Sequence, residues 1–155
     1  MSEMQKHGDA VTDGQVPLSP GHLVTLSVIL GAYFFIGTLY ATRTPAWQVP
    51  DEPAHYNYIR YLVEQRAFPV LHFGDYDQAY LSRLTGERFP PDLPVDSLRY
   101  ESHQPPLYYL LAAPVFAATG GNLIALRLFS LALGAGVAIF TFLLAREVFP
   151  RAPVL

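Results

Sequence analysis

The sequence predicts an all-α integral membrane protein, with two antiparallel transmembrane helices joined by a long extracytoplasmic loop that contains short interfacial helices. Two observations support this fold class. Residues 23–42 form a run of 20 residues without a charged side chain, and residues 128–145 form a second run of 18. Charged residues make up 15% of the chain, against about 25% in a soluble globular domain. The shortfall is concentrated in these two runs.

The first transmembrane helix is predicted at residues 22–43. At 1.5 Å per residue, 20 uncharged residues extend about 30 Å, the thickness of the hydrocarbon core. Arg43 and Trp47 follow the run, as a headgroup anchor and a residue of the aromatic belt. The alternative is a cleaved secretory signal, but the run is too long for one and the preceding tail contains three acidic residues. Residues 1–21 are polar and are predicted to form a flexible cytoplasmic tail.

Arg127 and Arg146 flank the second run, which predicts a transmembrane helix at residues 122–147. A charged side chain at the bilayer centre costs roughly 2.5–3.5 kcal/mol on insertion scales, so the two arginines mark the ends of this span. Asn122 is expected to cap the helix, and residues 148–155 are expected to form a second cytoplasmic tail. Two glycines near the middle of the run permit close contact with another helix. A buried helix of a soluble protein is the alternative, which the first run disfavours.

The loop at residues 44–121 is expected to contain two interfacial helices. The first, at about residues 52–66, begins after a capping Asp51 and has an apolar stripe that is expected to lie flat on the membrane surface. The second, at about residues 105–118, opens with two prolines. It is too short to span a bilayer, and Pro114 is expected to kink or end it. The stripe of the first helix consists of Tyr58, Ile59, Leu62 and Val63.

A first candidate site lies directly after the first predicted span, at Asp51, Glu52 and His55. Two adjacent carboxylates at the start of a helix lie at the positive end of its dipole, which favours their ionised form. An ionised carboxylate there can act as a general base or bind a divalent metal, and His55 follows Asp51 by one turn. The alternative is a structural cap followed by a surface histidine. The spacing leaves both interpretations open.

A second candidate site lies just before the 105–118 helix and in its first turn. It contains a carboxylate, an imidazole and three phenols beside a rigid Pro-Pro pair. Such a group is typical of a pocket for the polar headgroup of a lipid, and the alternative is a set of aromatic-belt residues with a loop histidine. The residues concerned are Tyr100, Glu101, His103, Tyr108 and Tyr109.

Composition excludes several classes of function. The chain has no cysteine, so thiolate metal sites and cysteine nucleophiles are excluded. Its net charge is −3 and it has no basic stripe, so nucleic acid is not an expected partner. The sequence also contains no Gly-rich phosphate loop, no GxSxG motif and no HExxH motif.

Three segments occur in a recognisable order: PDEPAHYNYIRYLVEQ, HQPPLYYLLAAPVF and LRLFSLALGAGVAIFTFLLAREVF. With the first span before them, they resemble the N-terminal part of the GT-C-type integral membrane glycosyltransferases, over residues 23–149. The resemblance is strongest to bacterial mannosyl- and aminoarabinosyl-transferase-like families, which use polyprenyl-phosphate sugars.

The resemblance implies a multi-pass protein of the bacterial cytoplasmic (inner) membrane, with both termini in the cytoplasm and the loop outside. It implies that Asp51, with Glu52 beside it, is the catalytic carboxylate, acting as a base or holding a divalent metal. His103 matches the family's H-P-P-L-Y-Y histidine, with Gln104 inserted here before the prolines. The residues expected to bind substrate are His55, Tyr100, Glu101, His103 and Tyr108.

Members of that family have many more spans, so the resemblance implies that catalysis needs helices beyond these two. The expected function is that of an N-terminal two-helix segment of a glycosyltransferase, which moves a sugar from polyprenyl phosphate to an extracytoplasmic acceptor. The alternatives are a non-catalytic accessory subunit of a larger membrane complex and a small lipid-binding module. The expected partners are the lipid bilayer, other transmembrane helices or subunits and, for a catalytic role, a lipid-linked sugar.

Overall fold

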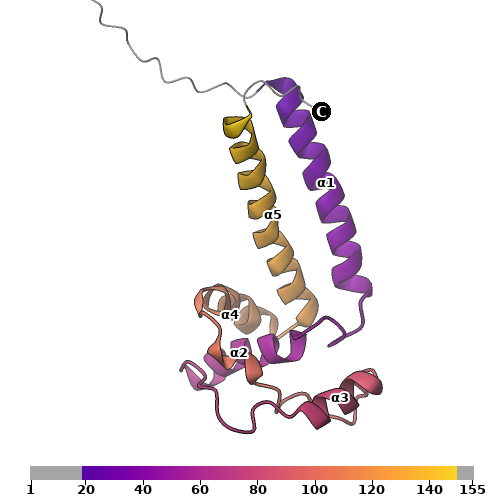
Figure 1. The fold of residues 1–155 in the computed structure, drawn as a ribbon, viewed down its shortest axis with the longest axis vertical. Helices are drawn as coiled ribbons and strands as arrows, with labels where there is room; N and C mark the ends of the chain where they lie inside the picture. Colours follow the sequence, from indigo (N-terminus) through magenta and orange to yellow (C-terminus); the bar gives the residue numbers. More distant parts are fainter. Residues whose placement is uncertain (1–18, 150–155) are drawn as a thin grey trace, which may run out of the picture.

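The computed structural model describes residues 19–149, and every regular element in this range is a helix (Figure 1). The prediction of an all-α chain is confirmed for this range. The predicted tails at residues 1–21 and 148–155 lie almost entirely outside it. The elements are α1 (Pro20–Arg43), α2 (Glu52–Gln65), α3 (Gln78–Gly86), the 3-10 helix η1 (Tyr100–His103), α4 (Leu107–Thr119) and α5 (Leu123–Val148).

Two of these helices, α1 and α5, are long and apolar enough to cross a membrane, with mean hydropathies of 1.9 and 2.3. α1 begins at Pro20, because the Ser19 hydroxyl accepts a hydrogen bond from the backbone N–H of His22 and proline suits the first helical position. α5 begins after Asn122, whose side chain accepts from the N–H of Ala125, as predicted.

α1 and α5 lie side by side, and the beginning of α1 is next to the end of α5 (Figure 1). Near their middle, the Tyr33 hydroxyl donates a hydrogen bond to the Leu131 carbonyl, at 3.0 Å. The same hydroxyl occupies space that Gly134 leaves free, because a Cβ at Gly134 would lie 2.2 Å from it. Of the two glycines expected to permit close contact, Gly134 does so, whereas a Cβ at Gly136 would have no described atom within 4 Å.

α2 and α4 pack against each other across one end of this pair (Figure 1). The stripe of α2 that was expected to lie on the membrane faces α4 instead, because α4 offers an apolar surface that covers it. Tyr58 and Ile59 are only 4% and 2% exposed, and the Tyr58 ring stacks on that of Tyr109 with centroids 3.6 Å apart. The shared core consists of Tyr58, Ile59, Tyr109, Ala112, Phe116 and Leu126, with Leu62 and Val63 packed against it.

One local expectation is wrong, and one of the two alternatives expected at Pro114 is excluded. Asp51 occupies the N-cap position of α2, but its side chain makes no capping hydrogen bond, because its backbone is left-handed with φ 58° and its carboxylate is bound elsewhere. Pro114 does not end its helix. α4 continues to Thr119, since its buried residues on both sides of the proline pack against α2, and it stops at Gly120, where φ is 62°.

Two buried polar side chains hold the Pro-rich stretch between α2 and α4. Asn57 donates hydrogen bonds to the carbonyls of Val95 and Leu98, at 2.7 and 2.8 Å. Asp75 accepts from Arg99 at 3.0 Å, in an ion pair whose carboxylate is buried. η1 follows Arg99 directly, so these contacts place it against α2.

Candidate functional site

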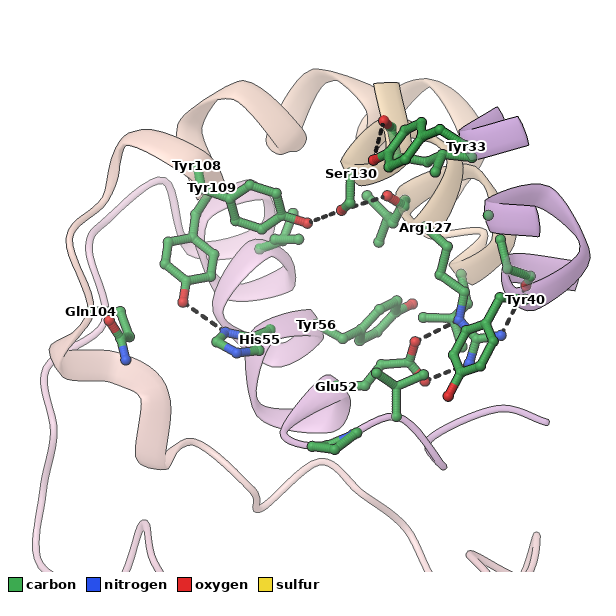
Figure 2. Close-up of a pocket in the computed structure, with 18 of the residues that line it drawn as sticks. Tyr33, Tyr40, Glu52, His55, Tyr56, Gln104, Tyr108, Tyr109, Arg127 and Ser130 are labelled. Carbon is green, nitrogen blue, oxygen red and sulfur yellow. Dashed lines mark hydrogen bonds and ion pairs between the residues drawn. The ribbon is translucent and has the colours of Figure 1, made fainter. Parts of the chain in front are cut away.

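A cavity of about 960 Å³ lies where α1 and α5 meet α2 and the start of α4 (Figure 2). Its volume is in the range of small-molecule sites. Most of the wall is aromatic or aliphatic, and the aromatic side chains are Tyr33, Tyr40, Tyr56, Tyr108 and Tyr109. The charged or polar members of the wall, tyrosines aside, are Glu52, His55, Gln104, Arg127 and Ser130.

Arg127 and Glu52 form a largely buried ion pair on one side of the cavity (Figure 2). Nε and Nη2 of Arg127 donate to the two carboxylate oxygens of Glu52, at 2.6 and 2.7 Å. The remaining donors of Arg127 reach backbone carbonyls at and just after the end of α1, so all five guanidinium donors are used. The backbone N–H of Trp47 also donates to Oε2 of Glu52, at 2.8 Å. The three carbonyls belong to Ala41, Thr44 and Pro45.

The lining tyrosines use most of their hydroxyl groups within the protein. Tyr33 donates to an α5 carbonyl, Tyr56 donates to the Gly121 carbonyl at 3.0 Å, and the Tyr108 hydroxyl lies 2.7 Å from that of Ser130. With these hydroxyls satisfied, the rings present apolar surface to the cavity. The walls therefore suit an apolar chain better than a polar headgroup.

His55 and Tyr109 form a further polar pair in the wall (Figure 2). Nδ1 of His55 lies 2.8 Å from the Tyr109 hydroxyl. Tyr109 is only 3% exposed, and this burial, followed by the nearby charge of Glu101, raises its pKa. The phenol therefore stays protonated at neutral pH and remains a hydrogen-bonding partner for His55.

Asp51 and Tyr100 form a pair beside the cavity. The Tyr100 hydroxyl donates to Oδ1 of Asp51 at 2.9 Å. Burial and then this hydrogen bond raise the pKa of Tyr100, so the phenol stays a donor. Asp51 is exposed, and its chain neighbours Pro50 and Glu52 both line the cavity. Among the described residues Oδ2 of Asp51 accepts no hydrogen bond.

The structure brings the predicted site residues together only in part. Glu52, His55 and Tyr108 line the cavity. Asp51 and Tyr100 do not line it; they bind each other, and Asp51 is next in the chain to Pro50 and Glu52, which do. The first candidate site and the Tyr108 end of the second therefore belong to one region, which sequence spacing did not reveal.

Glu101 and His103 do not line the cavity. Oε2 of Glu101 accepts a hydrogen bond from Gln104 at 2.7 Å, and Nδ1 of His103 lies 2.9 Å from the Tyr100 carbonyl oxygen. Both side chains therefore act within η1 and the residue after it. Within residues 19–149 no three His, Asp or Glu side chains gather closely enough to hold a metal ion.

Arg127, Tyr33 and Ser130 were not predicted as site residues. Arg127 was expected only to mark the end of a span. Tyr33 and Ser130 do have a signal in the sequence, because each interrupts an apolar run with a hydroxyl group. In membrane helices such groups commonly bond to a neighbouring helix.

Comparison of the chain with protein-family models, with curated proteins and with solved structures finds no match.

Proposed function

We propose that this chain is a membrane-embedded segment of a GT-C-type glycosyltransferase, which acts on a sugar linked to polyprenyl phosphate. In this proposal α1 and α5 are antiparallel transmembrane helices of the bacterial inner membrane, both termini are cytoplasmic, and residues 44–121 lie outside. The three sequence segments that resemble this family support the assignment, together with the two helices long enough to span a membrane.

The observation that favours this function most is the position of the cavity. It lies where the two apolar helices meet the polar loop, its wall is largely aromatic and aliphatic, and Asp51, paired with Tyr100, is the chain neighbour of two of its lining residues, Pro50 and Glu52. A lipid-linked sugar likewise combines an apolar part with a polar part, because its apolar chain ends in a polar group. The cavity would take the start of the chain, and the sugar would face Asp51.

Asp51 is the base in the proposed reaction. The hydrogen bond from Tyr100 holds Oδ1, and Oδ2 accepts the proton of the acceptor hydroxyl. The acceptor oxygen forms a bond to the anomeric carbon of the sugar, the bond from that carbon to the phosphate oxygen breaks, and polyprenyl phosphate leaves with the electron pair. Glu52 has no part in this transfer, because both of its oxygens are bound by Arg127.

Replacing Asp51 tests the assignment. We expect Asp51→Asn to reduce sugar transfer by about 100-fold or more, because a positioned base contributes a factor of about 10² to 10⁴. The measurement is transfer from a lipid-linked sugar in reconstituted membranes that contain the chain with its partners. Glu64→Gln, an exposed carboxylate on α2, is the matched control and should leave the rate unchanged. Transfer at the normal rate by Asp51→Asn would refute the role of Asp51.

The outer faces of the two long helices favour a second candidate, a non-catalytic accessory subunit. Among the most apolar 18 consecutive residues of α1 none is buried, and among the corresponding 18 residues of α5 only 6% are buried. Phe35 and Phe140 are 68% and 73% exposed, which leaves large surfaces for the helices of a partner. The same assay separates the two functions. An accessory subunit would give a complex that loses transfer when the chain is removed but not when Asp51 is changed.

A further inference from the structure

Tyr76 is an aromatic side chain that the protein holds in place without burying it. Its ring packs edge-to-face with that of Tyr100, with centroids 5.3 Å apart and ring planes at 82°. Its hydroxyl donates a hydrogen bond to the side-chain carbonyl of Gln78, whose amide group donates to the Ser82 hydroxyl at 3.0 Å. Tyr76 is nevertheless 54% exposed. It is therefore a fixed aromatic ring with much of its surface open to solvent.

Two successive contacts bring Tyr76 close to the proposed base. Asp75 forms an ion pair with Arg99 at 3.0 Å, and the backbone N–H of Arg99 donates to the Asp75 carbonyl at 3.3 Å. The residues that follow these two, Tyr76 and Tyr100, form the ring pair. Tyr100 in turn donates to Oδ1 of Asp51, the residue directly before α2. The chain after α2 thus returns to the start of that helix, where a single side chain separates Tyr76 from Asp51.

The surroundings of Asp51 differ between the cavity and Tyr76. Pro50 and Glu52, its chain neighbours, line the cavity, whereas neither Tyr100 nor Tyr76 does. In a single displacement the acceptor oxygen approaches the anomeric carbon from the face opposite the leaving group. The proposed reaction places the lipid and its phosphate in the cavity. The acceptor therefore has to reach Asp51 from outside the cavity, where Tyr100 and Tyr76 lie.

The chemistry of this surface matches that of a sugar ring. The face of an aromatic ring carries partial negative charge, and the C–H groups of a sugar are slightly positive because oxygen atoms on the same carbons withdraw electrons. The amide of Gln78 borders the ring, and the described contacts use one of its two N–H groups, which leaves the other for a sugar hydroxyl. The basic neighbour, Arg99, is paired with the buried Asp75, which offsets its attraction for a phosphate.

We propose that the acceptor is a carbohydrate, and that one of its sugar rings stacks on Tyr76 while the hydroxyl that receives the transferred sugar faces Asp51. This inference rests on the proposed function and adds a chemical class for the acceptor and a residue that binds it. Because Tyr76 is already fixed by Tyr100 and Gln78, its ring loses little freedom when a sugar binds.

Saturation-transfer difference NMR tests this stacking without requiring the reaction. The full chain would be reconstituted in phosphatidylcholine vesicles, its aromatic protons irradiated, and the methyl glycosides of glucose, galactose, mannose and N-acetylglucosamine used as probes. We expect at least one probe to receive saturation on the C–H protons of one ring face. Tyr76→Ala should raise its dissociation constant about fivefold or more, whereas Tyr76→Phe, which keeps the ring, should bind as the unchanged chain does.

Phe68→Ala is the matched control, because Phe68 is 55% exposed but follows the other end of α2. It should leave the dissociation constant unchanged, and so should an excess of inorganic phosphate. The inference is wrong if no probe receives saturation, if Tyr76→Ala binds normally, if Phe68→Ala loses as much affinity, or if phosphate displaces the probe.

The transfer assay separates this inference from the proposed function. If the probes bind through Tyr76 but the chain with its partners transfers no sugar, the carbohydrate site stands and the proposed function fails. If transfer occurs and Tyr76→Ala leaves the KM for the acceptor unchanged, the proposed function stands and this inference fails.

Discussion

At Arg127, one guanidinium joins three segments of the chain. It belongs to the second turn of α5, it binds the carboxylate of Glu52 at the start of α2, and it binds carbonyls at the end of α1. Because α1 ends here, no following turn supplies N–H groups to these carbonyls. The arginine donates to them instead and acts as a helix cap. The charge that marks the end of a span in the sequence therefore also fixes the position of the residue next to Asp51.

We expect Arg127→Ala to lower the free energy of unfolding by about 3 kcal/mol, because Glu52 would then be a buried charge without its partner. Denaturant titration in detergent micelles measures this. The exposed pair Arg83–Glu87 is the matched control. Its side chains are 58% and 49% exposed, against 11% and 10% for Arg127 and Glu52. Arg83→Ala should therefore leave the unfolding transition unchanged. The double variant Glu52→Gln with Arg127→Ala should recover part of the loss, and a double variant less stable than Arg127→Ala alone would contradict this explanation.

At the scale of helices, local sequence predicted much of what the structure contains. The uncharged runs predicted α1 and α5, and the cap at Asn122 predicted where α5 starts. The partner of the α2 stripe was not predictable. Periodicity shows that a helix has an apolar face, but lipid and another helix satisfy that face equally well. For the same reason, the capping role of Asp51 was wrong: a tyrosine 49 residues away binds its carboxylate instead.

The contact of α1 with α5 at Gly134 can be tested by substitution. We expect Gly134→Ala to lower the free energy of unfolding by about 1–3 kcal/mol, because its Cβ would lie 2.2 Å from the Tyr33 hydroxyl. Removing that hydroxyl leaves the nearest ring carbon at 3.4 Å, an ordinary contact distance. In a Tyr33→Phe background the same alanine should therefore cost little. Gly136→Ala, with open space at its Cβ, is the control, and equal losses at the two glycines would exclude this packing.

At the scale of the whole molecule, the helices form two pairs, α1 with α5 and α2 with α4, and the cavity lies between them. Its wall combines residues as far apart as Tyr33 and Leu131, which lie 98 positions from each other. Sequence spacing could identify Glu52, His55 and Tyr108 one by one as candidates. It could not place them around one space, because that depends on how the two pairs meet. The proposed location of this space outside the cytoplasm depends on the orientation of the two long helices in the membrane.

Topology is accessible to direct measurement because the chain has no cysteine. Single-cysteine variants Ser97→Cys, in the exposed loop, and Ser2→Cys, near the N-terminus, can be labelled in intact bacterial cells with a maleimide that does not cross the inner membrane. We expect Ser97→Cys to react and Ser2→Cys to react only after the cells are permeabilised. Charge gives little guidance here, since the loop is too long for its arginines to decide orientation. The reverse pattern would place the cavity and Asp51 on the cytoplasmic side, where no extracytoplasmic acceptor could reach them. Labelling of both variants in intact cells would exclude two antiparallel spans with a cytoplasmic N-terminus.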